Sequence, residues 1–217
     1  MIRRHRQARR FILRVSGETI KLTIPTRGSA RRALLWAQTK ADFVEAELAR
    51  APFPKPFEAG ASYPVLGQER RFVVGGRGLA EVLGGEVRAP LRAAQDPGPS
   101  FERAIRHAVK QAVLEDLTAF WSQLGVAPGR LTIRGMKGRW GSCGPQGQTS
   151  INWRLAFAPR EVLRYVAAHE AAHRIEANHS ARFWQVCERL DPDYAELDRW
   201  LTEHGRELFA YGRTTRR

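Results

Sequence analysis

The residues with the clearest chemical potential are two histidines and a glutamate in the segment His169-Glu170-Ala171-Ala172-His173. In a helix, at ~100° per residue, the two histidines lie about 40° apart on one face, so both can bind the same metal ion. Glu170 is rotated by about 100° from His169, which places its carboxylate beside that metal, where it can hold a water molecule. This spacing is that of the HExxH motif of zinc hydrolases.

A catalytic zinc site needs a third protein ligand, with the fourth position left to water or substrate. We expect His179 to be this ligand. A continuous helix would turn His179 about 240° away from His173, so the helix must end first. Asn178 tolerates the left-handed conformation that ends many helices, and we expect the helix to end there. Glu188 and Asp191 are the alternative third ligands.

The chain contains two cysteines, Cys143 and Cys187. Two thiols cannot form a disulfide framework, and without an export signal we expect both to be reduced. Cys187 fits the role of a small buried side chain in a core helix. A fourth ligand from Cys143 would make the zinc site closed and structural, and would leave Glu170 without a role.

The C-terminal half of the sequence is predicted to be mainly helical, with a small sheet. Apolar residues recur three and four apart after Ser100, and Gly125 ends this long helix. Alternating apolar residues predict strands at 130–134 and 149–155, on either side of a glycine-rich loop. Three further helices are predicted: one over 159–177, one over 181–190, and one that follows Asp191-Pro192-Asp193 and runs to 209.

The N-terminal half is predicted to be rich in strands. Residues 11–15 and 20–24 alternate across a turn and predict a β-hairpin, and one amphipathic helix is expected over 30–49. Short strands follow within 63–74 and at 86–89, in a segment rich in glycine and proline. We therefore predict an α+β fold. Its expected parts are a strand-rich region 1–99 with one helix and a mainly helical region 100–217 with a small sheet bordering the cleft, or both as one continuous domain.

Basic residues are concentrated at the start of the chain. The net charge is +14, and residues 1–32 hold ten Lys or Arg and one acidic residue, Glu18. Such a segment could bind phosphates or acidic partners. Arginine outnumbers lysine 31 to 5 over the whole chain, however, which is typical of a genome-wide codon bias, so we do not expect nucleic acid as the main partner. We interpret Arg3, Arg4 and Arg6 as a solvated surface, whereas for Arg9 and Arg10, which enter the first strand, phosphate binding and a solvated surface are both open. Arg3, Arg4 and Arg6 precede any predicted element.

The sequence lacks the marks of a membrane or exported protein. No apolar run approaches the ~20 residues that cross a bilayer. The apolar stretch after the basic start, Phe11 to Leu13, is shorter than a signal peptide requires. We expect a soluble, cytoplasmic protein without a membrane partner.

Several motifs, in order, resemble those of the YgjP-like metallopeptidase family, relatives of the SprT-like zinc proteases. They are Arg139-Trp140-Gly141-Ser142-Cys143, Ile151-Asn152, Tyr165-Val166, the HExxH segment, Asn178-His179-Ser180 and Phe183-Trp184. The likeness extends upstream to Arg9-Arg10 and the first hairpin. It implies a zincin-like metallopeptidase fold for region 100–217, Zn²⁺ bound by the two HExxH histidines and His179, and Glu170 as catalytic acid and base. Ala171 departs from the larger aliphatic residue usual in the family, which concerns packing only.

Motif and resemblance together predict a zinc metallopeptidase acting on a peptide or protein substrate. We expect substrate contacts from Arg139, Trp140 and Asn152, and pairing of an extended peptide with the strand Thr149–Leu155. One alternative is a metal-dependent phosphoanhydride hydrolase, a nucleoside triphosphate pyrophosphatase, because the family has also been connected with that reaction. The other is a nucleic-acid-binding module with structural zinc, in which Glu170 would be dispensable.

Overall fold

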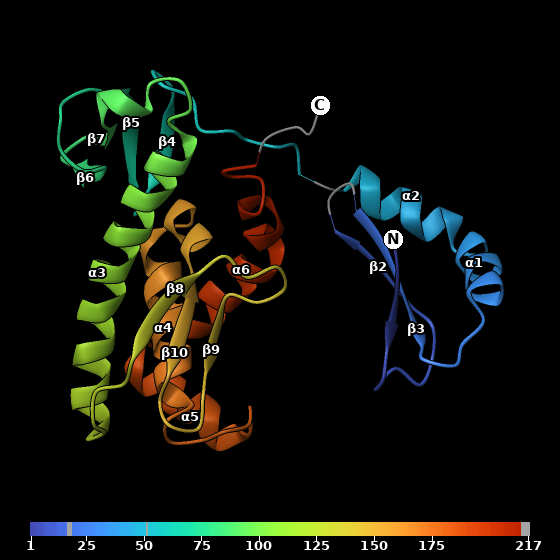
Figure 1. Cartoon of the computed structure of the whole chain (residues 1–217). Coiled ribbons are helices and arrows are strands. Elements are labelled where there is room, and N and C mark those ends of the chain that lie inside the picture. The colour runs from blue at the N-terminus through green and yellow to red at the C-terminus, as the bar shows by residue number, and fades with distance from the viewer. Residues whose placement is uncertain (17–18, 51, 214–217) are drawn as a thin grey trace. The chain divides into compact units, whose positions relative to one another are not determined.

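The computed structural model describes residues 1–16, 19–50 and 52–213 (Figure 1). The chain forms two compact units, Met1–Phe53 and Pro54–Arg217. Within the described ranges the architecture is mixed α/β, with six α-helices and three small mixed sheets. None of the described helices has the length and apolar character that a membrane crossing requires.

The first unit contains a three-stranded sheet with the strand order β1-β3-β2. Its strands are β1 (Ile2–His5), β2 (Ile12–Ser16) and β3 (Thr19–Pro25). β3 is antiparallel to β2, which confirms the predicted hairpin, and parallel to β1. β1 was not predicted, because its sequence Ile-Arg-Arg-His has no alternation of apolar and polar residues. Arg3 and Arg4 therefore lie in a strand and do not precede the fold.

Two helices, and not the single one expected over 30–49, complete this unit. They are α1 (Ala30–Gln38) and α2 (Ala41–Ala49). Ser29 caps the start of α1 with its side chain. At its end, the Thr39 hydroxyl donates a hydrogen bond of 2.7 Å to the carbonyl of Trp36, and this local bond competes with continuation of the helix.

A four-stranded sheet of the second unit packs on the first turns of the long helix α3 (Gly98–Leu124). Its order is β4-β5-β7-β6, and its strands are β4 (Ser62–Val65), β5 (Gln68–Val74), β6 (Glu81–Leu83) and β7 (Glu86–Ala89), followed by the 3₁₀ turn η1 (Leu91–Ala93). Phe72 and Phe101 meet with ring centroids 4.8 Å apart. Strands before residue 99 thus share a core with the helix after it, so the expected boundary lies inside one compact unit.

The second sheet of this unit carries the segment that borders the HExxH helix. Its order is β8-β10-β9, and its strands are β8 (Leu131–Arg134), β9 (Gly141–Cys143) and β10 (Thr149–Asn152). β9 lies in the expected glycine-rich loop and is too short to show a pattern. The strand expected over 149–155 ends early: the side-chain oxygen of Asn152 accepts a hydrogen bond from the backbone of Arg154 and starts the 3₁₀ helix η2 (Trp153–Phe157).

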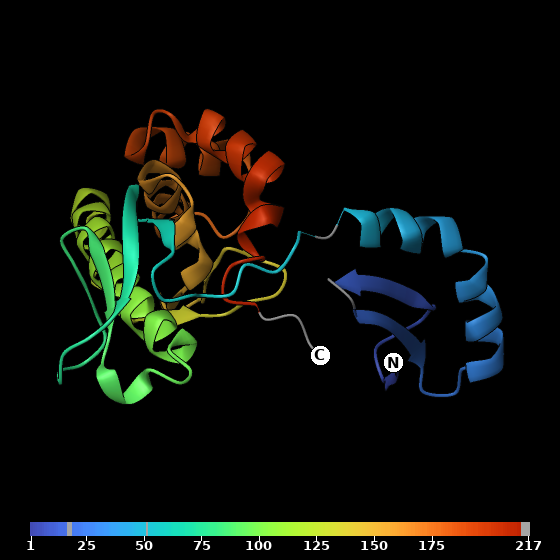
Figure 2. The ribbon, with the colours of Figure 1, turned by 90° about the horizontal axis from the view of Figure 1, so that it is seen from above.

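Three C-terminal helices follow, close to the positions that periodicity predicts. They are α4 (Arg160–Ala172), α5 (Ala181–Leu190) and α6 (Tyr194–Leu208). α4 packs against α3, α5 and α6 and also contacts β9 and β10 (Figure 2). Because neighbours surround it, nine of its thirteen residues are buried, and it forms a rigid base for the residues at its C-terminal end.

Candidate metal centre and catalytic carboxylate

Three imidazoles converge at the C-terminal end of α4. His169 and His173 lie one turn apart, and His179 approaches from the segment after the helix, with its Nε2 3.0 Å from the Nε2 of His169. One ring nitrogen from each histidine can be chosen so that all three lie within 4.8 Å of one another. Three nitrogen donors at this spacing can hold one divalent metal ion.

The end of α4 is what brings His179 back to the other two histidines. The helix stops at His173, whose backbone still has φ −62° and ψ −12°, and not at Asn178 as expected. Asn178 does not adopt a positive φ. The chain instead tightens into i to i−3 hydrogen bonds, from Arg174 to Ala171 at 3.0 Å and from Ile175 to Ala172 at 2.9 Å.

Hydrogen bonds behind the rings orient two of the three imidazoles. The Nδ1 of His173 lies 3.1 Å from the carbonyl of Glu176, which fits an N–H donor there and leaves Nε2 for the metal. The Nδ1 of His169 lies 3.4 Å from the hydroxyl of Tyr165. That hydroxyl donates a 2.7 Å hydrogen bond to Asp198 on α6, so its oxygen is left to accept from His169.

Burial favours the neutral form of His169 and His173, and the neutral form of an imidazole is the one that binds metal. Burial lowers the pKa of His169 to about 4, and the neighbouring His173 and His179 act in the same direction. Burial also lowers the pKa of His173.

An aromatic side chain of α5, Phe183, packs against all three histidine rings. The ring centroid of Phe183 lies 4.9, 4.6 and 4.7 Å from those of His169, His173 and His179. The side chain of Ser180 caps α5 by accepting a hydrogen bond from the backbone of Phe183. Because this cap residue directly follows His179, the start of α5 fixes the backbone next to His179.

Glu170 lies beside this cluster in an apolar setting. Its side chain is 4% exposed, and its Oε2 has no hydrogen-bond partner among the described residues. Burial raises the pKa of Glu170 to about 8, and the charge of Arg139 opposes that shift. A buried carboxylate oxygen without a partner in the protein can accept a proton from a bound molecule.

β9 passes close to Glu170 at Gly141. A Cβ placed on Gly141 would overlap the carboxylate of Glu170. The position of this carboxylate therefore depends on a residue that has no side chain.

We expect Gly141→Ala to displace the Glu170 side chain and to destabilise the protein by about 1–3 kcal/mol, the usual cost of overpacking. Chemical denaturation and turnover measure the two effects. Gly138→Ala is the control, because a Cβ there meets no atom within 4 Å. Equal stability and turnover for both variants would show that Glu170 has room to move.

We expect loss of the Tyr165 hydroxyl to weaken zinc binding by about 10–100-fold, the usual effect of removing a group that orients a metal ligand. Tyr165→Phe keeps the buried ring and removes the link between Asp198 and His169. Chelator competition measures the zinc affinity. Tyr194→Phe is the control, since Tyr194 contacts Trp184 through its ring. An unchanged affinity in Tyr165→Phe would reduce Tyr165 to a packing residue.

The three residues expected to contact the substrate differ from one another in exposure. Arg139 is exposed near Glu170. Trp140 is half-buried, with its ring 4.6 Å from that of Phe209, the residue that follows α6. Asn152 is fully buried, and its amide donates to the carbonyls of Met136 and Arg139 at 2.9 and 3.3 Å. Asn152 thus orders the loop before β9 and presents no surface to a substrate.

The strand expected to pair with a substrate has no free edge. β10 is the central strand of its sheet, hydrogen-bonded to β8 on one side and β9 on the other. A peptide cannot add to a strand that is already paired on both edges. The pairing expected for Thr149–Leu155 is therefore wrong, and the edge strand on this side of the sheet is β9.

The alternative ligands lie away from the histidine cluster. Asp191 is buried and forms a 2.8 Å ion pair with Arg164. Glu188 is exposed on α5. Cys187 is fully buried, and burial raises its pKa to about 12. Cys143 is half-buried, and burial, reinforced by the charge of Glu170, raises the pKa of its thiol.

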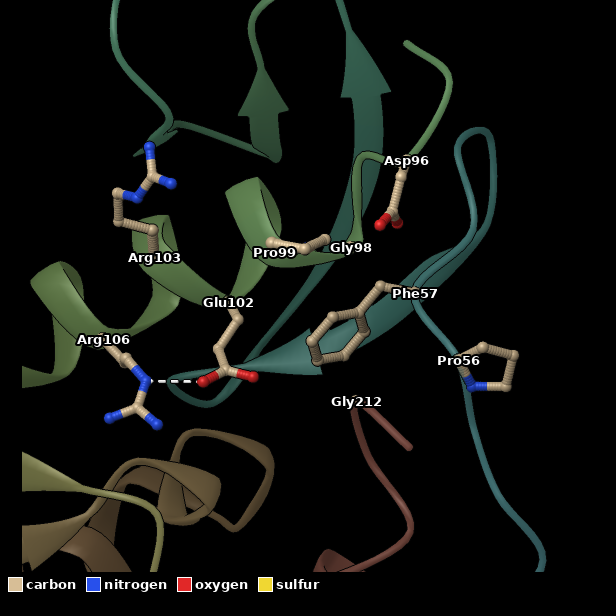
Figure 3. Close-up of a pocket in the computed structure, with 9 residues that line it drawn as sticks. All are labelled: Pro56, Phe57, Asp96, Gly98, Pro99, Glu102, Arg103, Arg106 and Gly212. Carbon is tan, nitrogen blue, oxygen red and sulfur yellow. Dashed lines mark hydrogen bonds and ion pairs between the residues drawn. The ribbon is translucent and has the colours of Figure 1, made fainter. Parts of the chain in front are cut away.

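A cavity of about 560 Å³ lies elsewhere in the second unit, at the start of α3 (Figure 3). Phe57 and Gly212 line it together with Glu102 and Arg106, whose side chains pair with each other at 2.7 Å. The three histidines and Glu170 are not among its lining residues, so it is separate from the candidate metal centre.

A histidine cluster beside a buried carboxylate on one helix is an arrangement suited to metal-dependent hydrolysis. The chain belongs to the YgjP-like family: the family model described as "YgjP-like, metallopeptidase domain" matches residues 9–204. The family resemblance seen in the sequence is thereby confirmed.

Individual relatives match shorter parts of the chain. A stretch of 50 residues is 38% identical to the UTP pyrophosphatase of Escherichia coli (strain K12), covering 21% of this chain and 30% of that protein. The zymogen structure of the metallopeptidase abylysin from Pyrococcus abyssi has 26% identity and a TM-score of 0.39, over 43% of this chain and 96% of that one. For jannalysin from Methanocaldococcus jannaschii the values are 16%, 0.38, 42% and 94%.

Proposed function

We propose that this protein is a zinc-dependent metallopeptidase in which His169, His173 and His179 bind the metal and Glu170 is the general base. The observation that carries the proposal is the position of Glu170 Oε2, which has no hydrogen-bond partner among the described residues, beside three converging imidazoles. Imidazole nitrogen donors in this number fit zinc, which takes three protein ligands in catalytic sites. Membership of a metallopeptidase family supports the same assignment.

Zinc held by the three imidazoles would supply Lewis-acid chemistry, which polarises a carbonyl oxygen and makes water more acidic. Glu170 Oε2 takes the proton from the attacking water and returns it to the leaving amine. Burial suits the carboxyl to both tasks, because it strengthens proton binding relative to an exposed glutamate. Tyr165 and Asp198 orient the His169 ring, whose Nε2 lies toward His179 and would be free to bind the metal.

We infer that an extended substrate pairs with β9. This strand is at the edge of its sheet, and Gly141 brings its backbone against Glu170. Main-chain pairing at an edge strand gives affinity without dependence on substrate side chains. Arg139, exposed at the entrance to β9, remains a candidate for contact with the polar groups of the substrate.

A second candidate function is hydrolysis of nucleoside triphosphates. The observation that favours it is the 50-residue match to a protein described as a UTP pyrophosphatase. The same metal chemistry would serve, because a divalent ion polarises a phosphoryl oxygen as well as a carbonyl. Fold and metal site alone do not choose between the two substrates.

Activity profiling of the zinc-loaded protein decides between these functions. A library of extended peptides and a panel of nucleoside triphosphates are tested in parallel. The Glu170→Gln variant is assayed on both as the inactive control. Cleavage of peptides that disappears in the variant supports the peptidase. Pyrophosphate release from a nucleotide without peptide cleavage would replace it with the second function, and no activity on either panel would contradict both.

A further inference from the structure

The sheet of the first unit has one face that its helices leave open. Leu22 and Ile24 of β3 point toward α1 and are buried against Ala33. Side chains alternate along a strand, so Lys21 and Thr23 point to the opposite face. The register adds Arg3 and His5 from β1, and Ile12 and Arg14 from β2, to that open face.

The open face is positively charged. Arg3, Arg14 and Lys21 are exposed, and none of the three has a hydrogen-bond or ion-pair partner among the residues that the structure describes. Arg4, on the other face, behaves differently: its guanidinium donates to the carbonyls of Thr26 and Gly28 at 2.7 and 2.8 Å. One arginine of β1 thus stabilises the fold, while its neighbour is left free.

Charges are also segregated within the unit. The acidic residues that the structure describes there, Asp42, Glu45 and Glu47, all lie on α2. Arg14 and Lys21 are directly paired in the register of β2 and β3. Like charges opposite each other destabilise a strand pair, so the fold maintains this arrangement at a cost to stability.

We infer that this open face, defined by Arg3, Arg14 and Lys21, binds the phosphate backbone of a nucleic acid. The three Cα atoms lie about 5–12 Å apart, given a strand spacing of ~4.8 Å. Cations spread in this way meet successive phosphodiesters, whereas a single phosphate needs groups that converge on one point. Ile12 and Pro25 are the apolar side chains of this face, and His5 carries its one aromatic ring. A single ring cannot stack on successive bases, so the contacts are to the backbone and sequence is not read.

The end of β1 enlarges this basic region. Arg4, His5, Arg6 and Gln7 line an open cavity of about 710 Å³. No acidic side chain is among these lining residues. A bound strand that crosses the open face can therefore continue over the end of β1 without meeting a carboxylate.

The test compares two triple variants of the full-length protein that lose the same charge. Arg3→Gln/Arg14→Gln/Lys21→Gln neutralises the open face, and Arg77→Gln/Lys110→Gln/Arg130→Gln neutralises exposed positions of the second unit. Fluorescence anisotropy with labelled 30-nucleotide RNA, single-stranded DNA and duplex DNA is recorded from low to high salt. Thermal unfolding verifies that both variants fold.

Removing three phosphate contacts should weaken binding at least about tenfold at low salt and should reduce the slope of log affinity against log salt by about 2 to 3. The control variant should keep the wild-type slope. The probe that is bound most tightly shows whether the face prefers the backbone of RNA or that of DNA.

Equal slopes in the two variants would overturn the inference, since net charge alone would then explain the binding. Absence of binding by the wild type would do the same. Polyglutamate of similar length is the third arm: if it binds through the same three residues as tightly as the nucleic acids, the face is a site for acidic protein and the assignment fails.

Discussion

Glu170→Gln should lower turnover by at least ~10²-fold, the usual contribution of a general base, while the protein keeps its zinc. Glutamine matches glutamate in size and hydrogen-bonding reach but cannot take a proton from water at neutral pH. The buried oxygen without a partner is what the substitution disables. The measurements are kcat/KM on the best substrate from the activity panels and zinc content by elemental analysis.

The control for this prediction is Glu203→Gln, which makes the same chemical change at an exposed position of α6. Its turnover should equal that of the wild type. The stability of Glu170→Gln should not fall, because a buried carboxylate without a partner is itself destabilising. Wild-type turnover in Glu170→Gln would exclude the general-base mechanism and leave a structural metal site.

The sequence predicts those parts of the fold that repeat a pattern over many residues. α3 has 27 residues and α6 has 15, so apolar side chains at helical spacing recur often enough to identify them. β1, β6 and β9 have four, three and three residues, and no periodicity can be read from so few. β9 is the important omission, because it determines which strand edge faces Glu170.

The candidate site divides in the same way. The two helix histidines and Glu170 lie within five residues, and helical geometry alone places them together. Asp198 acts on His169 through Tyr165 from a helix 33 residues beyond Tyr165, and only the packing of α6 on α4 brings it there. Asn152 shows the converse: a polar residue in a family motif suggested substrate contact, but its amide is used by the protein's own backbone.

Removal of any one of the three imidazoles should lower zinc affinity by more than the ~10–100-fold that loss of an orienting partner costs. The changes are His169→Ala, His173→Ala and His179→Ala, each of which leaves two nitrogen donors for a metal that prefers at least three protein ligands. Chelator competition gives the affinities. Thermal unfolding with and without zinc gives a second readout, because a ligand that binds only the folded state stabilises it.

His107→Ala is the control for this series, since His107 is exposed on α3 and lies outside the histidine cluster. It should keep full zinc affinity and the full rise in melting temperature on zinc addition. His179→Ala is the decisive variant, because His179 is the one ligand that HExxH spacing does not specify. Full zinc affinity in this variant would transfer the third-ligand role to Glu188 or Asp191. For Asp191 that transfer would require breaking the ion pair with Arg164, so Asp191→Asn in the same background would then identify which carboxylate binds.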